Sequence, residues 1–382
     1  MGANDWKVHN PSGTKRVVVT KDLPGERWLE ILTAANCKVE IGTSTDILSV
    51  AEIKSKIGNQ CDAVIGQLTE KWGEELFSAL KNAGGKVYAN YAVGYNNVEL
   101  PMATKCGIPV GNTPGVLTET TAEMAISLTF SAARRVIEAD AFMRAEKYKG
   151  WLPTLYLGEL MTRKTVGVIG AGRIGAAYAK MMVEGFKMDL AYFDPYPNSY
   201  LENYVKAYGE FLKSQGEKPV KITRYGTVEE VLKVSDVVSL HPLLDNTTHH
   251  LMNAERLNLM KKNAILINAA RGPIIDEVAL VNHCRKNPDF KVGLDVFEDE
   301  PLMKPGLKDL PNVVIVPHIA SATQWTRQGM AILAASNVAG LLNGYGVWTD
   351  QNNILPFLGD HAPKASPSIV NAKDLGLPAV TA

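Results

Sequence analysis

The sequence contains little that would favour a secreted, metal-bound or membrane protein. Only four of its 382 residues are cysteines, at positions 37, 61, 106 and 284, and no two lie closer than 24 residues. Without a CxxC or CxxH spacing, a disulfide framework and a structural zinc site are poorly supported, and a reducing compartment fits. No apolar run approaches the roughly 18 residues of a membrane span. The start, MGANDWKVHN, lacks the apolar stretch of a signal peptide.

An excess of charge of one sign is also lacking. The 40 Lys and Arg residues balance the 40 Asp and Glu residues, so the formal net charge is zero. A neutral chain has no broad electrostatic attraction for nucleic acid or for an anionic membrane. We therefore expect a soluble intracellular protein with no nucleic-acid partner and no membrane partner. Its length suggests two or more domains.

What the chain does contain is a recurring pattern of a short apolar run, a turn and a helical stretch. Strands that alternate with helices favour a parallel sheet covered on both faces. About the first 115 residues should therefore form a small doubly wound unit. In this part strands are expected over 16–20, 38–41, 62–66 and 86–90, and helices near 25–35, 50–57 and 73–82.

A long helical pattern separates this unit from a second series of strands. The helix is expected to run uninterrupted from Glu119 to about Lys147, because apolar residues recur there at i+3/i+4 spacing. A linker over 150–164 follows. Further strands are expected over 165–170, 189–194, 236–241, 264–268, 291–297 and 313–318.

Three other segments complete the organisation of the chain. The stretch 198–224 exceeds what a minimal crossover needs, so we expect an extra surface helix and a strand-like turn there, without a catalytic role. One more helix should run from Thr323 to about Leu342. The tail, 350–382, contains four prolines and is expected to be extended and partly disordered.

The first strand of the second series leads into a glycine-rich turn with the spacing GxGxxG, residues 170–175. Gly170 would permit the tight turn, Gly172 would let the backbone approach a pyrophosphate, and Gly175 would allow the helix to pack closely on the strand. The alternative is a glycine turn in a non-binding domain. The strand before it, the helix after it and Asp194 at the end of the next strand favour a dinucleotide site. Because Asp194 suits a ribose diol and would repel a 2′-phosphate, NAD(H) is favoured over NADP(H).

Three polar residues follow apolar strands, where the ligand crevice of such a sheet lies. His318 ends the apolar strand VVIVP and could exchange a proton, and Glu300 in DVFEDEP could stabilise its imidazolium form. Arg271 in NAARGP could bind a substrate carboxylate with its fixed fork of donors. Each residue also has an ordinary interpretation, as a core histidine, a turn acid and a salt-bridge arginine, respectively.

Five blocks of sequence together resemble the D-2-hydroxyacid dehydrogenase family, in the family's order, within a resemblance that runs from about Asp62 to Gly344. The blocks are VIGAGRIG, HPLLDNTTHHL, ILINAARGPIIDE, GLDVFEDEP and VPHIASAT. Within the family, the plant-type hydroxypyruvate reductases are most similar, through VIGQLTEKWGE, YAVGYNNV, VGNTPGVLTETTAE, FMRAEKYKGWLP and ASPSIVNAKDLGLP. Ala320 and Ala270 replace a Gly and a Ser that are frequent in the family, but neither position supplies chemistry.

The resemblance implies an α/β fold with two doubly wound parallel-sheet domains and a cleft between them. A flavodoxin-like substrate domain would comprise 1–118 and 319–382, and a Rossmann NAD-binding domain, 119–318, would be inserted into it. Residues 119–150 would form a dimerisation helix and a linker, so a homodimer is expected.

The resemblance also implies roles for individual residues. Arg271 would bind the carboxylate and carbonyl of a 2-keto acid, Glu300 would orient His318, and His318 would be the general acid–base. Leu68, Val93 and Gly94 would contact the substrate together with Arg271, and no metal is expected. The cofactor would contact Gly170, Gly172, Arg173, Ile174, Gly175, Asp194, Pro242, Thr247, Ala269, Arg271, Asp295 and His318.

The implied reaction is the NADH-dependent reduction of hydroxypyruvate to D-glycerate, with glyoxylate to glycolate as a secondary activity, in photorespiratory-type metabolism. The alternatives are another D-2-hydroxyacid dehydrogenase, of the D-lactate or phosphoglycerate type, and a non-metabolic NAD-sensing corepressor. The plant reductases that the chain resembles are peroxisomal, whereas this sequence ends in Val380-Thr381-Ala382 rather than in a peroxisomal tripeptide. The mitochondrial matrix, the peroxisomal matrix and the cytosol therefore all stay open.

Overall fold

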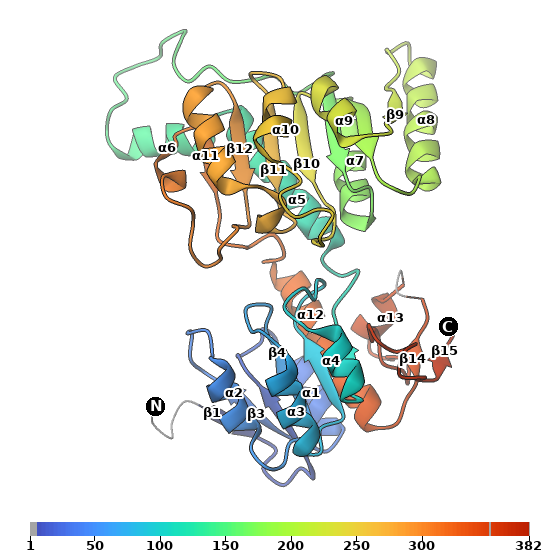
Figure 1. Ribbon diagram of the computed structural model, residues 1–382. Helices are drawn as coiled ribbons and strands as arrows, with labels where there is room; N and C mark the ends of the chain where they lie inside the picture. Colours follow the sequence, from blue (N-terminus) through green and yellow to red (C-terminus); the bar gives the residue numbers. More distant parts are fainter. Residues whose placement is uncertain (1–5, 351–352, 382) are drawn as a thin grey trace. The chain divides into compact units, whose positions relative to one another are not determined.

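The computed structural model describes residues 6–350 and 353–381 and divides into two compact units (Figure 1). The first unit combines the chain up to Leu117 with the chain from Ala322 onward, and the second unit spans Thr118–Ser321. The sequence analysis placed the corresponding boundaries at residues 119 and 318. The last part of the chain therefore returns to the unit that its first part builds.

The first unit is built on a six-stranded sheet with the strand order β1-β3-β2-β4-β5-β6. Neighbouring strands are parallel except β1, which pairs antiparallel with β3. From β2 onward the order is the flavodoxin-like 2-1-3-4-5. The sequence analysis missed β1, an edge strand with an exposed centre, and β6, which has only two residues. The strands are β1 (Trp6–His9), β2 (Lys15–Val19), β3 (Cys37–Gly42), β4 (Ala63–Gly66), β5 (Val87–Asn90) and β6 (Val110–Gly111).

The central strands of this sheet are fully buried, as Val17, Val18 and Val19 of β2 show. This burial explains why the strands are continuous apolar runs in the sequence. The longest helix of the unit, α12, packs against α1, β4 and β5, and 14 of its 19 residues are buried, most of them apolar. The helices are α1 (Arg27–Ala34), α2 (Val50–Ile57), α3 (Glu74–Asn82), α4 (Leu100–Lys105), α12 (Gln324–Leu342) and α13 (Leu355–Leu358). The predicted helices near 25–35, 50–57, 73–82 and 323–342 are confirmed.

The tail was predicted to be partly disordered, and for residues 353–381 that prediction was wrong. Besides α13, this segment contains β15 (Ala379–Val380), which pairs with β14 (Val347–Trp348). The buried side chain of Asn371 accepts a hydrogen bond from the backbone N–H of Val110 at 2.8 Å and donates one to the carbonyl of Ile108 at 3.0 Å. A polar side chain therefore supplies the hydrogen bonds that order a segment poor in regular structure. Residues 351–352 and 382 lie outside the described part of the chain.

The second unit is built on a seven-stranded parallel sheet with the order β13-β12-β11-β10-β7-β8-β9. Numbered from β7, this is the Rossmann order 3-2-1-4-5-6 with a seventh strand at the edge. The predicted α/β fold class with parallel sheets is confirmed. The edge strand β13, which leads to His318, is only half-buried although it is an apolar run in the sequence. The strands are β7 (Thr165–Ile169), β8 (Asp189–Phe193), β9 (Ile222–Arg224), β10 (Val237–Leu240), β11 (Ile265–Asn268), β12 (Lys291–Leu294) and β13 (Val313–Ile315).

The long helix expected after Glu119 is two helices, α5 (Thr118–Ala133) and α6 (Val136–Arg144). Arg135 between them adopts a left-handed conformation with φ of 54°, which ends the helical path. The two helices have different surroundings: α5 packs on α7, β11 and β12, whereas α6 has no buried residue. The prediction of one continuous helix was therefore wrong.

The remaining helices of the second unit cover its sheet. The extra helix and strand-like turn expected over 198–224 are confirmed as α8 and β9, which Figure 1 shows side by side. Within the described residues, no helix has both the length and the apolar character needed to cross a bilayer. The helices are α7 (Arg173–Phe186), α8 (Ser199–Ser214), α9 (Val228–Val234), α10 (Ala254–Leu259) and α11 (Glu277–Lys286).

Candidate active site

The strand order of the second unit reverses between β7 and β10, and the loops that follow these two strands touch. Gly170 has a φ of +89°, and a Cβ placed on it would lie 2.7 Å from the backbone carbon of His241 and from the nitrogen of Pro242. Only glycine fits there, because both the backbone conformation and the space exclude a side chain. Ligands of parallel α/β sheets bind at such a reversal point, outside the carboxyl ends of the strands.

The other two glycines of the turn have contrasting surroundings. A Cβ on Gly175 would overlap the carbonyl of Gly170, so the start of α7 lies directly against the turn. A Cβ on Gly172 would meet nothing within 4 Å, and Gly172 is the N-cap of α7 without a side-chain cap. Open space therefore lies over the amino end of α7, and this arrangement fits a pyrophosphate.

Asp194 follows β8 and is held against the glycine turn. Its Oδ2 accepts a hydrogen bond from the backbone N–H of Ala171 at 2.8 Å, and its Oδ1 accepts one from that of Tyr196 at 2.9 Å. Each carboxylate oxygen has two acceptor positions, so both oxygens can still accept a hydroxyl proton. Asp194 thus has the position and the acceptors that a ribose diol requires.

Arg224 at the end of β9 is a residue that the sequence analysis missed. Its Nη2 donates hydrogen bonds of 3.0 Å to the carbonyl oxygens of Asp194 and Pro195. Residues 195–200, which directly follow Asp194 in the chain, contain no Arg or Lys. Arg224 comes 30 residues later and reaches Asp194 because β9 lies next to β8. The strand order was the signal that could have found it.

His318 and Glu300 form a direct pair. His318 Nδ1 lies 2.9 Å from Glu300 Oε2, while Glu300 Oε1 accepts a hydrogen bond from the backbone N–H of Phe297 at 3.0 Å. Burial alone would raise the pKa of the Glu300 carboxyl, but the hydrogen bond and positive charge of His318 outweigh it and lower that pKa. Glu300 is therefore an anion at neutral pH, with one oxygen fixed on the imidazole.

The backbone of His318 is itself held in an uncommon conformation, with φ of 51°. Its N–H donates to the carbonyl of Asp295 at 2.8 Å. The buried carboxylate of Asp295 accepts from the N–H groups of Ile319 at 2.7 Å and Ala320 at 3.0 Å. Burial raises the pKa of Asp295, although those two hydrogen bonds oppose the rise. Asp295, predicted as a cofactor residue, thus fixes the turn that presents His318.

Arg271 lies next to this pair. Its Nη1 donates to the carbonyl of Ala270 at 2.7 Å, and its own carbonyl accepts from Asn268 Nδ2 at 2.8 Å. Burial lowers the pKa of the Arg271 guanidinium, and the negative charge of Glu300 counteracts that effect. A guanidinium keeps its proton under any ordinary condition. The structure therefore brings Arg271, Glu300 and His318 together at the carboxyl ends of β11, β12 and β13.

The other predicted cofactor residues lie on neighbouring loops. Pro242 follows β10, and the buried Ala269 follows β11. Thr247 is exposed, and its N–H and hydroxyl both donate to Asp245 Oδ1, at 2.7 and 2.6 Å. Arg173 and Ile174 are the first two residues of α7. Their contacts with a cofactor stay a prediction.

The predicted substrate residues Leu68, Val93 and Gly94 belong to the first unit, on the loops after β4 and β5. The carbonyl of Val93 accepts from Asn112 Nδ2 at 2.9 Å, and that of Ala92 accepts from the N–H of Thr113 at 2.9 Å. Because the C=O and N–H of a trans peptide point in opposite directions, the amides of Gly94 and Val93 both face away from residues 112–113. The loop thus presents two adjacent donors on one side.

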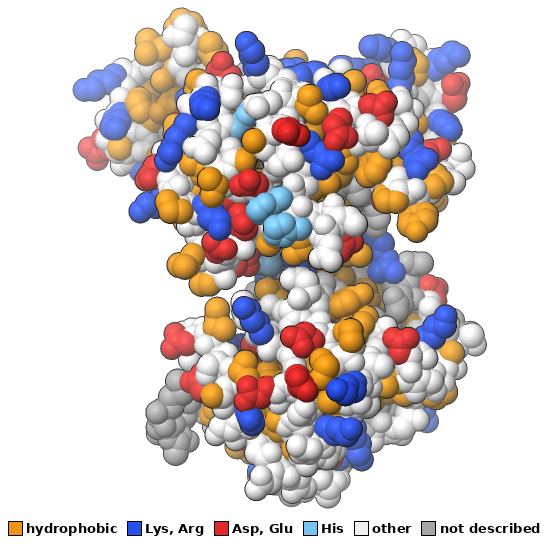
Figure 2. Space-filling view, viewed as in Figure 1, with side chains coloured by type: hydrophobic (Ala, Val, Ile, Leu, Met, Phe, Trp, Pro, Cys, Tyr) orange, Lys and Arg blue, Asp and Glu red, His pale blue; other side chains and the backbone are white. Residues whose placement is uncertain are grey.

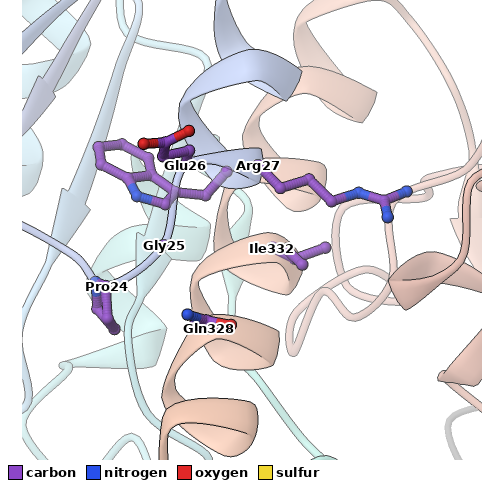
Figure 3. A pocket seen from close by; sticks show the side chains of 7 residues that line it. Pro24, Gly25, Glu26, Arg27, Gln328 and Ile332 are labelled. Carbon is purple, nitrogen blue, oxygen red and sulfur yellow. The ribbon is translucent and has the colours of Figure 1, made fainter.

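A cavity of about 470 Å³ also lies in the first unit, between the start of α1 and helix α12 (Figure 3). It is lined by Pro24, Gly25, Glu26, Arg27, Trp28, Gln328 and Ile332, none of which is a predicted site residue. Within residues 6–350 and 353–381, no three His, Cys, Asp or Glu side chains are grouped so that they could hold a metal ion.

Residues 126–320 match the family model described as the NAD-binding domain of the D-isomer specific 2-hydroxyacid dehydrogenases. This stretch contains the glycine turn, Asp194 and the Arg271–Glu300–His318 cluster. The chain belongs to this family. A D-2-hydroxyacid dehydrogenase is an oxidoreductase that acts on a small hydroxy acid with a nicotinamide cofactor.

The dehydrogenase is similar over nearly its whole length to two plant proteins. It is 63% identical to the glycerate dehydrogenase of Cucumis sativus, over 97% of this chain and 98% of that one. It is 61% identical to a peroxisomal glycerate dehydrogenase of Arabidopsis thaliana, over 97% of each chain. Among solved structures, the glyoxylate reductase of Paecilomyes thermophila superposes with a TM-score of 0.70 at 27% identity, covering 86% of this chain and 95% of that one.

Proposed function

We propose that this dehydrogenase reduces hydroxypyruvate to D-glycerate with NADH and, as a secondary activity, glyoxylate to glycolate. The observation that carries the proposal is the 2.9 Å pair of His318 and Glu300 beside Arg271. The choice of hydroxypyruvate as the substrate rests on the similarity to the two plant glycerate dehydrogenases. The secondary activity rests on the similarity to glyoxylate reductases.

The cluster can supply the two things that a carbonyl reduction requires of the protein, a proton donor and a positive charge beside the forming alkoxide. Because Nδ1 of His318 is bonded to Glu300, Nε2 is the ring nitrogen that faces a substrate and gives its proton to the forming alkoxide. Arg271 stabilises negative charge on that oxygen. Bound NADH supplies the hydride. The anionic Glu300 places a negative charge beside the imidazole, and this charge favours the proton-donating form of the pair.

The preference for NADH over NADPH is part of the proposal. It is supported by Asp194, whose carboxylate faces the glycine turn and would repel a 2′-phosphate. Arg224 opposes this effect, because its guanidinium lies at the backbone of Asp194 and carries a positive charge. We expect NADH to be preferred, with Arg224 reducing the discrimination against NADPH.

We also propose that the protein is a homodimer. Helix α5 is packed inside its own unit, so the surface available for a second copy is α6 with the segment that follows it. This surface exposes an unusual concentration of large apolar side chains. They are Val136, Ile137, Met143, Tyr148, Trp151, Leu152, Leu157 and Leu160, with Trp151 exposed to 78%. Light scattering at micromolar concentration should give twice the 41.5 kDa of one chain.

The experiment that tests the function is a substrate panel. Hydroxypyruvate, glyoxylate, pyruvate and phosphohydroxypyruvate are each offered with NADH and with NADPH, and kcat/KM is measured. The proposal requires hydroxypyruvate with NADH to give the highest value. A maximum with pyruvate or phosphohydroxypyruvate would assign another activity of the family, and the lack of any turnover would favour a corepressor.

For the compartment, we propose the peroxisomal matrix, the mitochondrial matrix or the cytosol. Imaging of two fluorescent fusions, each of which leaves one terminus of the chain free, distinguishes these three.

A further inference from the structure

The loop that carries Glu300 is held by a second pair of carboxylates, Glu277 and Glu298. Glu277 Oε1 accepts a hydrogen bond from the N–H of Glu298 at 2.7 Å, and Glu298 Oε2 accepts one from the N–H of Glu277 at 3.2 Å. Glu277 Oε2 also accepts from the N–H of Lys304 at 3.3 Å. One side chain therefore holds both ends of the segment 298–304, with Glu300 between them.

The burial of Glu277 makes this reciprocal pair of hydrogen bonds unusual. It is the first residue of α11 and only 1% exposed, although an ionised carboxylate is costly to bury. Burial raises its pKa, whereas the hydrogen bonds from Glu298 and Lys304 oppose the rise. The Glu277 carboxylate is thus buried, and the described hydrogen bonds that it accepts come from backbone N–H groups of the Glu300 loop.

Glu298 connects this loop to a third segment. Its Oε1 lies 3.0 Å from Nε2 of His250 and 3.7 Å from Nζ of Lys304. His250 stacks on the exposed His249, with ring centroids 4.1 Å apart, and its N–H donates to the carbonyl of Pro273. Figure 2 shows histidine side chains beside acidic ones on the surface of the second unit. The loop of Thr247 is thereby joined to the Glu300 loop.

The segment after Arg271 packs against the same place. A Cβ on Gly272 would overlap the carbonyl of Phe297, so the two backbones are in direct contact. Three loops, carrying Thr247, Arg271 and Glu300, are therefore joined where Glu277, Glu298 and His250 meet. These three residues form what we call the loop clamp.

We propose that the loop clamp positions Glu300 against His318 during the reaction, so that Glu277, Glu298 and His250 are positioning residues for proton transfer. This inference rests on the proposed role of the His318–Glu300 pair. The physical reason is that Glu300 stabilises the imidazolium only while its Oε2 stays within hydrogen-bond distance, and its loop has little regular structure to keep it there. The charged groups facing Glu277 are Glu298 and Lys304, and those facing Glu300 are His318, Arg271 and Asp295.

The test uses Glu277→Gln, which keeps the size of the side chain but replaces one acceptor oxygen with a donor. We expect kcat for the keto acid to fall about ten- to a hundredfold, as for a small displacement of a reacting group. The basic limb of the pH–rate profile should shift to lower pH, because the imidazolium is less stabilised, and the affinity for NADH should not change. In a Glu300→Gln background, Glu277→Gln should cause no further shift, because its effect acts through Glu300.

Two further variants make the test specific. Asp236→Asn is the matched control: Asp236 also accepts a backbone N–H, from Thr165 at 2.9 Å, but at the amino end of the strands. It should change stability without moving the pH profile. His250→Phe keeps the aromatic ring but removes the nitrogen bonded to Glu298, at a half-buried position, and should shift the profile in the same direction by less. If Glu277→Gln does not fold, His250→Phe decides the test.

The proposal is overturned if the folded variant has the wild-type pH profile, or if its shift is equally large in the Glu300→Gln background. The profiles are recorded with whichever 2-keto acid the wild type reduces. A wrong assignment of hydroxypyruvate would appear in the wild-type panel and would leave this test intact.

Discussion

The carboxyl edges of the two sheets carry different side chains, although the central strands of both sheets are parallel and similarly wound. In the second unit this edge holds ionised groups, with Arg271, Glu300 and His318 at neighbouring strand ends. In the first unit, Asn90 and Asn112 bond to backbone carbonyls of the loop with Val93 and Gly94. Glu70, a buried acid that follows β4, has its pKa raised by burial, which favours its neutral form. In the proposed reaction, the second unit would supply the charged groups and the first unit would orient backbone donors toward the substrate.

The largest effect should come from removing the proton donor on the charged edge. His318→Asn should lower kcat about 10²- to 10⁴-fold, which is what general acid catalysis contributes. Binding of NADH, measured by fluorescence titration, should change little, because the replacement keeps a small polar side chain. A variant that retains more than a tenth of wild-type kcat would show that another group supplies the proton.

Weakening the acid at the glycine turn should have the next largest effect. Asp194→Ser removes a charge-assisted hydrogen bond of about 1.5–3 kcal/mol, so NADH affinity should fall roughly ten- to a hundredfold. The preference over NADPH should narrow, and Arg224→Ala in the wild-type background should widen it. Unchanged NADH affinity in Asp194→Ser would remove Asp194 from the cofactor site.

Glu300→Gln should lower kcat at least as much as Glu277→Gln, because Glu277 acts through Glu300, and should also change the pH dependence of kcat. The lowered pKa of Glu300 means that its carboxylate is ionised through the neutral range and favours the protonated form of His318. Without that charge the imidazolium is less stabilised, so the basic limb of the pH–rate profile should move to lower pH. A profile that overlays the wild type would show that this carboxylate does not tune the donor.

The smallest effect should come from the neutral edge of the first unit. Asn112→Ala removes the hydrogen bond to the carbonyl of Val93, worth about 0.5–1.5 kcal/mol, so KM for the keto acid should rise roughly two- to tenfold. The pH profile should not move, because no ionised group is lost. Ser368→Ala is the matched control, since Ser368 bonds to Asn112 Oδ1 and not to the loop. A shift of the pH profile in Asn112→Ala would contradict the division of work between the two edges.

Much of this architecture could be predicted, because strands that are buried on both faces appear in the sequence as continuous apolar runs. The predicted strand ends led to the glycine turn, Arg271, Glu300 and His318, and the structure brings the last three together. The break between α5 and α6 could not be predicted, because neither proline nor glycine marks it and an arginine adopts the left-handed conformation. The order of the tail could not be predicted, because it depends on hydrogen bonds between Asn371 and the distant residues Ile108 and Val110.

Long-range partners also explain what was missed around the site. Arg224 reaches Asp194 only because two strands are adjacent, and the reciprocal bonds of Glu277 and Glu298 join residues 21 positions apart. Neither glutamate differs in the sequence from an ordinary acid at a helix start or in a turn. The periodicity of apolar residues indicates which face of a helix or strand is buried. Contacts between residues on different loops can be recognised only once the three-dimensional arrangement of those loops is known.

The return of the chain to the first unit determines the order in which the protein can fold during synthesis. The second unit is continuous, from Thr118 to Ser321, and all its strands have been made once Ile315 leaves the ribosome. The first unit must wait, because α12 packs on β4 and β5 and Asn371 bonds to β6 only after nearly the whole chain is finished. Until then its sheet has an uncovered apolar face, which is where a nascent chain aggregates or binds a chaperone.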